Sequence, residues 1–193
     1  MCCSFRRLLV SLLMLALGGC GMGDDLLPSD SDLRAVSGGG AYLPGEPVGE
    51  ATRAAPLETV DGAVVRLDEL LNDPLEPPRA VVLYFTMWCP ICLAHTDHLY
   101  NQVLPRHASE PVRFLVVDYV SGSWVDMRGA AQANGYLGAA GLEIVRDAEG
   151  VLFDRLHGAM GQVVVVDGEG VIRMNASYRD GGELEAVLDR LLP

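Results

Sequence analysis

The stretch AVVLYFTMWCPIC, residues 80–92, decides the fold, because a continuous apolar run passes directly into two cysteines three positions apart. The run predicts a buried strand over residues 80–86. The pattern after it predicts a helix from Pro90 to about Val103, since proline suits the first turn of a helix. Cys89 and Cys92 are therefore expected at the start of this helix, one turn apart.

Two cysteines at a strand-to-helix junction predict a redox site. The free amides and the positive dipole end of a helix stabilise a thiolate on its first turn, and the thiolate is the form that attacks disulfides. Cys89 is the candidate nucleophile. Cys92 follows one turn later on nearly the same face, close enough to form an intramolecular disulfide and release a bound partner.

The segments on both sides of this stretch alternate between strand and helix patterns. Pro105 is expected to end the first helix, and Asp61-Gly62 predicts a tight hairpin turn ahead of it. Further strands are expected at 57–60, 64–67, 112–118, 142–146, 162–167 and 171–175, and further helices at 68–71, 125–134, 151–156 and 182–192. This order predicts an α/β fold, a three-layer α/β/α sandwich around a mixed central sheet with an N-terminal hairpin extension.

The first nineteen residues predict an export signal, with two arginines, a ten-residue apolar core and two glycines before Cys20. The apolar core is too short to span a bilayer, which takes about 20 residues. The run LGGC at residues 17–20 resembles the lipobox of bacterial lipoproteins, which implies that Cys20 carries lipid. An ordinary cleaved signal followed by an incidental cysteine is the alternative.

The cysteine count favours a working pair over a structural disulfide. Of five cysteines in the chain, Cys2 and Cys3 lie in the signal and Cys20 takes the lipid, so the mature domain keeps Cys89 and Cys92. A bridge across three residues closes too small a loop to stabilise the fold much by chain entropy. An exported chain with no other cysteine pair therefore points to redox chemistry.

Composition divides the chain and excludes several functions. Residues 20–52 are rich in Gly, Ser, Asp and Pro and predict a flexible tether, while residues 53–193 are expected to form one domain. All 14 basic residues are arginine, which excludes a Schiff-base lysine and a phosphate-loop lysine. The net charge of -12 disfavours nucleic acid and anionic lipid surfaces, so membrane attachment is expected through the lipid.

Residues 56–192 resemble the thioredoxin-like superfamily, and within it the membrane-anchored TlpA and ResA proteins, which are related to the AhpC/TSA redoxins. The resemblance rests on the Asp-Gly hairpin, the apolar strand, the WCPIC motif and a later strand that ends in Asp-Gly-Glu-Gly. It implies that Cys89 attacks, that Cys92 resolves and that Trp88 shields the pair from water. It also implies that Trp88, Pro90, Met160 and Gly161 contact the partner protein. No cofactor is expected.

The same resemblance implies an extracytoplasmic protein-disulfide oxidoreductase in a bacterial cell envelope, held by its lipid with the domain facing the periplasm or the exterior. Its expected partners are exported proteins with thiols or disulfides and a membrane or periplasmic electron donor. The direction of electron transfer depends on the reduction potential and stays open.

Two residues depart from the family pattern. The family has a cis-proline facing the cysteines, whereas this chain has Gly161 there, preceded by Met160. A trans peptide and a more mobile loop are expected. The buried aspartate of thioredoxins is replaced by Leu83, and His95 lies three residues after Cys92, where it is a candidate for proton transfer. The alternative is a polar residue on a partly exposed helix face.

Two other functions fit the same residues. Thr86, near Cys89, resembles the peroxide-orienting threonine of peroxiredoxins, although Val82 stands where that family has proline. A thiol peroxidase is therefore one alternative. The other is a non-enzymatic copper- or zinc-binding lipoprotein, with Cys89, Cys92 and a ligand from elsewhere such as His157.

Overall fold

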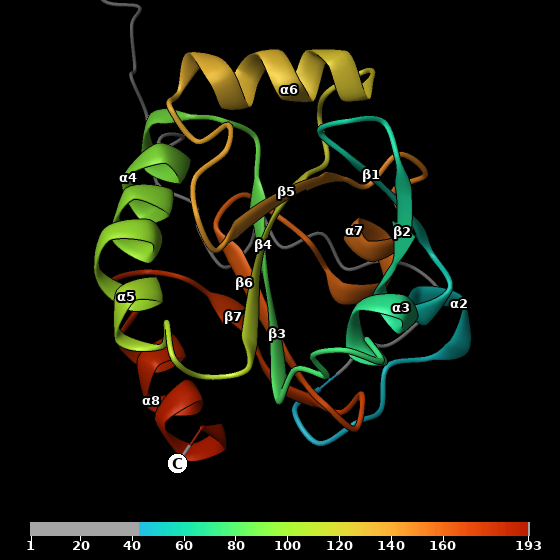
Figure 1. Cartoon of the computed structure of the whole chain (residues 1–193), viewed down its shortest axis with the longest axis vertical. Coiled ribbons are helices and arrows are strands. Elements are labelled where there is room, and N and C mark those ends of the chain that lie inside the picture. The colour runs from blue at the N-terminus through green and yellow to red at the C-terminus, as the bar shows by residue number, and fades with distance from the viewer. Residues whose placement is uncertain (1–42, 193) are drawn as a thin grey trace, which may run out of the picture. The chain divides into compact units, whose positions relative to one another are not determined.

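The computed structural model describes residues 43–192, and within them a single seven-stranded mixed sheet carries helices on both faces (Figure 1). The strands are β1 Pro56–Thr59, β2 Val64–Arg66, β3 Ala80–Thr86, β4 Val112–Asp118, β5 Leu142–Arg146, β6 Gln162–Asp167 and β7 Ile172–Ser177. Their order across the sheet is β2-β1-β5-β4-β3-β6-β7. The predicted signal, Cys20 and most of the predicted tether lie outside the described residues.

The helices are α2 Glu50–Arg53, α3 Leu67–Leu71, α4 Pro90–His98, α5 Leu104–Arg106, α6 Trp124–Ala133, α7 Val151–Leu156 and α8 Gly182–Leu191, with a π-helical turn η1 at Leu99–Val103. Figure 1 shows α4, α5 and α8 on one side of the sheet and α2, α3 and α7 on the other. In the described part of the chain, no helix is long and apolar enough to cross a bilayer.

The side chains of β3 pack into two separate hydrophobic cores, one on each face of the sheet, because successive side chains of a strand point to opposite faces. Val82 and Tyr84 pack with residues of α6 and α8, whereas Leu83 and Phe85 pack with residues of α3 and α7. All seven residues of the strand are buried. A strand covered on both faces reads as a continuous apolar run, so the prediction of a three-layer sandwich is confirmed.

The predicted N-terminal hairpin is present. Strand β1 pairs antiparallel with β2 through a turn in which Gly62 has a φ of 78°, a value that glycine tolerates without strain. Strand β1 also pairs antiparallel with β5, so the N-terminal hairpin extends the sheet. At the other edge, β6 pairs antiparallel with β7, while β3, β4 and β5 run parallel.

The packed part of the chain begins before residue 53. Pro47 forms a β-bridge with Val171, and the amide of Val48 donates to the Gly170 carbonyl at 2.8 Å. The side chains of Val48 and Thr52 are buried. The last residues of the segment interpreted as a tether therefore lie against the edge of the sheet.

The helix after the cysteines does not end at Pro105, contrary to the prediction. After α4 the backbone widens into the π-helical turn η1, in which the amide of Leu104 donates to the Leu99 carbonyl, and helical residues continue to Arg106. Proline lacks an N–H and its ring crowds the carbonyl four residues earlier. The wider turn shifts that carbonyl, which allows the chain to pass through Pro105.

Candidate active site

Cys89 and Cys92 lie together where β3 passes into α4. The Sγ atoms of the two cysteines are 3.0 Å apart, and both thiols are free. Cys89 is the N-cap of α4, where its Sγ accepts a hydrogen bond from the Cys92 amide at 3.3 Å, and Pro90 occupies the first turn. Cys89 is half-buried and Cys92 is buried, so a partner can reach only the first sulfur.

The position of Cys89 at the start of a helix was expected to stabilise its thiolate, but the surroundings of the sulfur favour the protonated thiol instead. Burial raises the pKa of Cys89 above that of an ordinary cysteine, and the neighbouring Cys92 thiol adds to the rise. Hydrogen bonds from the amides of Cys92 and Ile91 act in the opposite direction but are the smaller effect. Desolvation of the charged form therefore outweighs the helix amides in the reduced pair.

Met160 contacts Cys89, although the two residues are 71 positions apart in the sequence. Its Sδ lies 3.2 Å from Cys89 Sγ. The next residue, Gly161, has a φ of 76° and a trans peptide bond. Its amide donates to the Phe85 carbonyl at 3.1 Å, and its carbonyl accepts from the Tyr178 amide at 2.8 Å. The residue at the cis-proline position is thus held by the backbone on both sides.

A second glycine positions the same loop. Gly158 is buried, and a Cβ atom on it would lie 2.4 Å from the Phe85 ring. The residue before it, His157, ends α7 in the left-handed region with a φ of 55°. The chain therefore turns away from α7 and passes closely over the end of β3, which places Met160 beside Cys89.

Trp88 is fixed by contacts at both of its ends. Its backbone lies in the left-handed region with a φ of 60°, which is uncommon for a residue other than glycine. Its amide donates to Thr86 Oγ1 at 3.0 Å, and its indole Nε1 donates to Asp118 Oδ2 at 2.7 Å. Asp118 also accepts from Ser121, so the loop after β4 holds the tryptophan next to the cysteines.

The side chains of His95 and Tyr84 contact each other close to Cys92. The Tyr84 hydroxyl lies 3.1 Å from His95 Nδ1 and 3.5 Å from the Cys92 carbonyl oxygen. Burial raises the pKa of Tyr84, and the charge of a nearby Cys92 thiolate adds to the rise. Burial also lowers the pKa of His95, and the neighbouring His98 adds to this effect. The imidazole is therefore kept in its neutral form, which can accept a proton.

Sequence reasoning missed three residues of the site, namely Tyr84, Asp118 and Tyr178. The Tyr178 ring packs 4.8 Å from the His95 ring and 5.5 Å from the Tyr84 ring, measured between centroids. Asp118 is fully buried at the end of β4. A phenolic hydroxyl in the middle of a run of apolar residues is the signal that could have pointed to Tyr84, because a buried hydroxyl needs a partner.

The peroxidase alternative depends on Thr86, and the metal-binding alternative depends on three ligands grouped around one ion. The Thr86 side chain is fully buried, and its hydroxyl oxygen accepts a hydrogen bond from the Trp88 amide, so the hydroxyl faces the protein rather than the solvent. Between residues 43 and 192, no three His, Cys, Asp or Glu side chains are grouped to hold one metal ion. The ligand set of Cys89, Cys92 and His157 is therefore not assembled.

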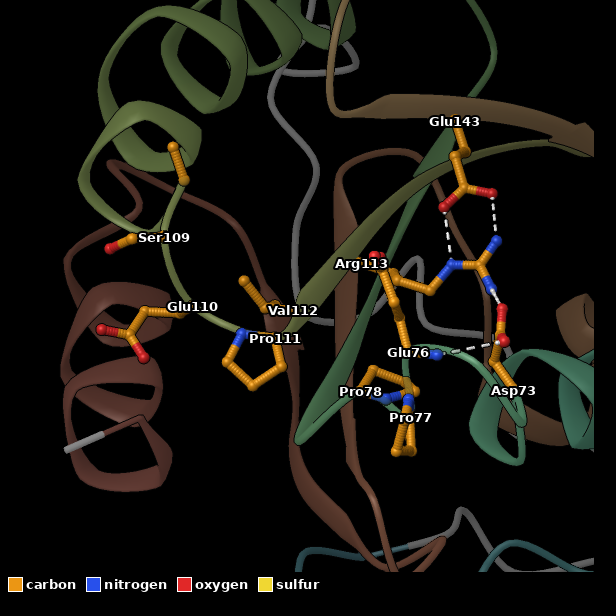
Figure 2. Close-up of a pocket in the computed structure, with 11 residues that line it drawn as sticks. Asp73, Glu76, Pro77, Pro78, Ser109, Glu110, Pro111, Val112, Arg113 and Glu143 are labelled. Atoms are coloured by element: carbon orange, nitrogen blue, oxygen red, sulfur yellow. Dashed lines mark hydrogen bonds and ion pairs between the residues drawn. The ribbon is translucent and has the colours of Figure 1, made fainter.

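A hollow of about 700 Å³ lies at the opposite end of the sheet. It is lined by residues before β3, by the segment that enters β4, by the first residues of β4 and by Glu143 of β5, whereas the cysteines follow β3. Figure 2 shows the Arg113 guanidinium between two carboxylates. Glu143 accepts two hydrogen bonds from it at 2.6 and 2.7 Å, and Asp73 forms an ion pair with it at 3.7 Å. The arginine is neutralised by these partners, and the hollow contains no cysteine or histidine.

The fold is shared with thioredoxin-like proteins of known structure. No protein-family model and no curated protein matches the sequence. A secreted Mycobacterium tuberculosis disulfide oxidoreductase homologous to Escherichia coli DsbE has 19% identity and a TM-score of 0.53, with 74% of this chain and 99% of that chain covered. A PrxQ cysteine-to-serine mutant from Xylella fastidiosa has 18% identity and a TM-score of 0.57, covering 79% and 97%.

A protein disulfide isomerase homologue from Bacteroides thetaiotaomicron, described as a putative isomerase, has 15% identity and a TM-score of 0.57, covering 80% and 91%. At these identities the comparisons establish the fold alone. The described residues thus form a thioredoxin-like domain, and its paired cysteines lie at the end of a central strand.

Proposed function

We propose that this protein is an extracytoplasmic thiol-disulfide oxidoreductase of the TlpA and ResA type that exchanges disulfides with partner proteins. The observation that carries the proposal is the 3.0 Å separation of Cys89 Sγ and Cys92 Sγ, with the first sulfur accessible and the second buried. This difference gives the two thiols different roles. A partner disulfide can meet Cys89, and only the internal Cys92 can then resolve the product.

The exchange proceeds in two balanced steps. The Cys89 thiolate attacks one sulfur of a partner disulfide, which forms a mixed disulfide and releases the partner's other sulfur as a thiolate. The Cys92 sulfur, after losing its proton, attacks Cys89 Sγ and releases the second partner thiolate. Two electrons pass to the partner, and the Cys89–Cys92 disulfide remains. With an oxidising partner both steps run in reverse.

The proton of Cys92 has a route to His95. The Tyr84 hydroxyl lies 3.1 Å from His95 Nδ1 and 3.5 Å from the Cys92 carbonyl oxygen, and the Cys92 thiol is close enough to raise the pKa of the tyrosine. It can donate to the imidazole while it accepts from the thiol, so the proton moves without formation of a buried tyrosinate. Because the pKa of His95 is lowered, the imidazole is available as an acceptor at neutral pH.

The cellular setting belongs to the same proposal. Lipid on Cys20 would hold the protein at a bacterial membrane, and residues 21–42 would connect the domain to it. The absence of lysine and the net charge of -12 support attachment through lipid rather than through a basic surface. The proposed partners are exported proteins with thiols or disulfides, and an electron donor of the membrane or the periplasm.

Mixed-disulfide trapping tests the proposal. Cys92→Ala leaves Cys89 able to attack but removes the resolving thiol, so partner proteins should accumulate on Cys89 as complexes that reductant dissolves. The matched control, Cys89→Ser with Cys92→Ala, should trap nothing. Equal trapping by both variants, or by neither, would refute disulfide exchange at Cys89.

The peroxidase alternative has its own assay. Hydrogen peroxide consumption by the wild-type protein should be no faster than that of a Cys89→Ser variant, because the Thr86 side chain is fully buried. A rate that depends on Cys89 and on Thr86 would favour the peroxidase instead.

A further inference from the structure

Three sulfur atoms converge at the active site, which is one more than disulfide exchange requires. Cys89 Sγ lies 3.0 Å from Cys92 Sγ and 3.2 Å from Met160 Sδ. The cysteines belong to the start of α4, while the methionine comes from the loop between α7 and β6. Two independent parts of the chain therefore bring a thioether against a dithiol.

We propose that the reduced protein binds one Cu(I) ion through Cys89, Cys92 and Met160. Soft, polarisable sulfur donors select Cu(I), whereas zinc favours a fourth ligand and accepts nitrogen or oxygen donors. Thioether sulfur has little affinity for hard cations. The combination of two thiolates with a thioether therefore distinguishes copper from the other common metal ions.

The sulfur positions require a small adjustment to hold the ion. A metal–sulfur bond of about 2.3 Å places the sulfurs of a planar three-coordinate site about 4.0 Å apart. Each contact to Cys89 Sγ would lengthen by about 1 Å from its value of 3.0 or 3.2 Å. Rotation of the Cys89 and Met160 side chains supplies this shift, because both residues are only partly buried and the methionine chain is unbranched.

Charge and burial are compatible with the ion. Binding replaces two thiol protons by one Cu(I), and no change of oxidation state is involved. Cys92 is buried and Cys89 is half-buried, so an ion held between them would be largely shielded from solvent. Oxidation of the pair to a disulfide removes both thiolates. Metal binding and disulfide exchange therefore exclude each other at the same sulfurs, and the metal site stands whether or not the proposed function is correct.

The loop geometry explains why Met160 can serve as the third ligand. Gly161, at the position where the family has cis-proline, is anchored through its amide to Phe85 and through its carbonyl to Tyr178. Gly158 packs against the Phe85 ring. Met160 is thus held between two anchored glycines with its thioether directed at Cys89.

A copper competition assay with the full chain tests the site. Reduced protein, kept anaerobic, is titrated with Cu(I) against the colorimetric chelator bicinchoninate, and X-ray absorption counts the sulfur neighbours of the bound ion. We expect one Cu(I) per chain with three sulfur neighbours. Met160→Leu should weaken Cu(I) binding by about 10-fold or more and leave two sulfur neighbours, since even ligand-supporting residues contribute about 10- to 100-fold.

Met87→Leu is the matched control, because Met87 is exposed and precedes the motif. It should leave both the Cu(I) affinity and the sulfur count unchanged. Equal affinities of the wild-type and Met160→Leu proteins, or two sulfur neighbours in the wild-type protein, would overturn the assignment of Met160. Failure of the wild-type protein to compete for Cu(I) would overturn the site as a whole, and neither result would bear on mixed-disulfide trapping.

Discussion

Burial governs the reactivity of Cys89 more than its position at the start of α4. The Cys92 amide donates to its sulfur, as a helix end should, yet the pKa of the thiol is raised because the sulfur also loses solvent and faces a second thiol. A dithiol whose protonated form is favoured lacks the thiolate stabilisation that makes some enzymes strong oxidants. The reduced pair should therefore be a better electron donor than acceptor.

The first prediction concerns the pH dependence of this thiol. Only the thiolate reacts with iodoacetamide, and a raised pKa means that the thiolate appears at higher pH than in an ordinary cysteine. The alkylation rate of Cys89 should therefore keep rising above pH 8.5, the usual pKa of cysteine. Mass spectrometry identifies the modified sulfur, with Cys92→Ala as the variant that removes the neighbouring thiol. A plateau below pH 8 in the wild-type protein would contradict the prediction.

The second prediction concerns the Tyr84 hydroxyl. Tyr84→Phe keeps the ring that packs against Tyr178 but removes the link between Cys92 and His95. Release of a partner from the Cys89 mixed disulfide should slow by about 100-fold, the low end of general acid–base effects. Its pH profile should also lose the step due to His95. Single-turnover kinetics at several pH values measure both effects.

Tyr136→Phe is the control for this change. It removes a buried hydroxyl that donates to Asp97 at 2.6 Å, on the far side of α4 from the site. It should cost about 1 kcal/mol of stability while leaving the release rate unchanged. An unchanged rate in Tyr84→Phe as well would remove the tyrosine from the proton route.

At the scale of elements, the site depends on how closely the α7–β6 loop crosses the end of β3. Gly158 allows this approach, because any side chain there would meet the Phe85 ring. The β3 strand carries Phe85 on one face and Tyr84 on the other, so one strand supports both the loop and the proton route. Displacement of the loop would move Met160 away from Cys89.

The third prediction follows from that contact. A Cβ atom at position 158 would lie 2.4 Å from Phe85, so Gly158→Ala forces the ring or the loop to move and should destabilise the domain by about 1–3 kcal/mol. Gly129→Ala is the matched control, since Gly129 lies within α6 with open space around it, and it should stabilise by about 0.5–1 kcal/mol. Urea unfolding of the full chain measures both changes. Changes of the same sign would contradict the argument.

At the scale of the whole molecule, the sequence predicts most elements because apolar periodicity and turn residues are local signals. The ranges of β3, β4, β5 and β6 agree with the sequence prediction. The prediction failed at Pro105, because a π-helical turn depends on how the whole helix packs. It also placed the start of the packed chain after Val48, which is buried by an edge contact that no local pattern marks.

The site was only partly predictable for a related reason. The spacing of Cys89 and Cys92 is local and fixes their separation on α4. The contacts of Met160 and Asp118 join segments distant in the sequence, so they require the register of the sheet. Tyr84 follows Leu83, the position where thioredoxins carry aspartate, so the two side chains point to opposite faces of the strand. The face that carries Tyr84 is the one covered by α4, where its hydroxyl meets His95.

The last prediction links His95 to the stability of the molecule. Its pKa is lowered on folding, first by burial and then by His98, against an opposing hydrogen bond to the Arg179 backbone. The folded protein therefore binds fewer protons than the unfolded chain near the ordinary histidine pKa of about 6.5. The free energy of unfolding should then rise with pH through that region, and stability should be lost as the pH falls from about 6.5 through the lowered pKa.

His95→Gln removes this titration, so its stability should approach that of the wild-type protein as the pH falls from 7.5 to 5. Urea unfolding at these pH values gives both curves, and a constant difference between them would show that the His95 pKa does not change on folding.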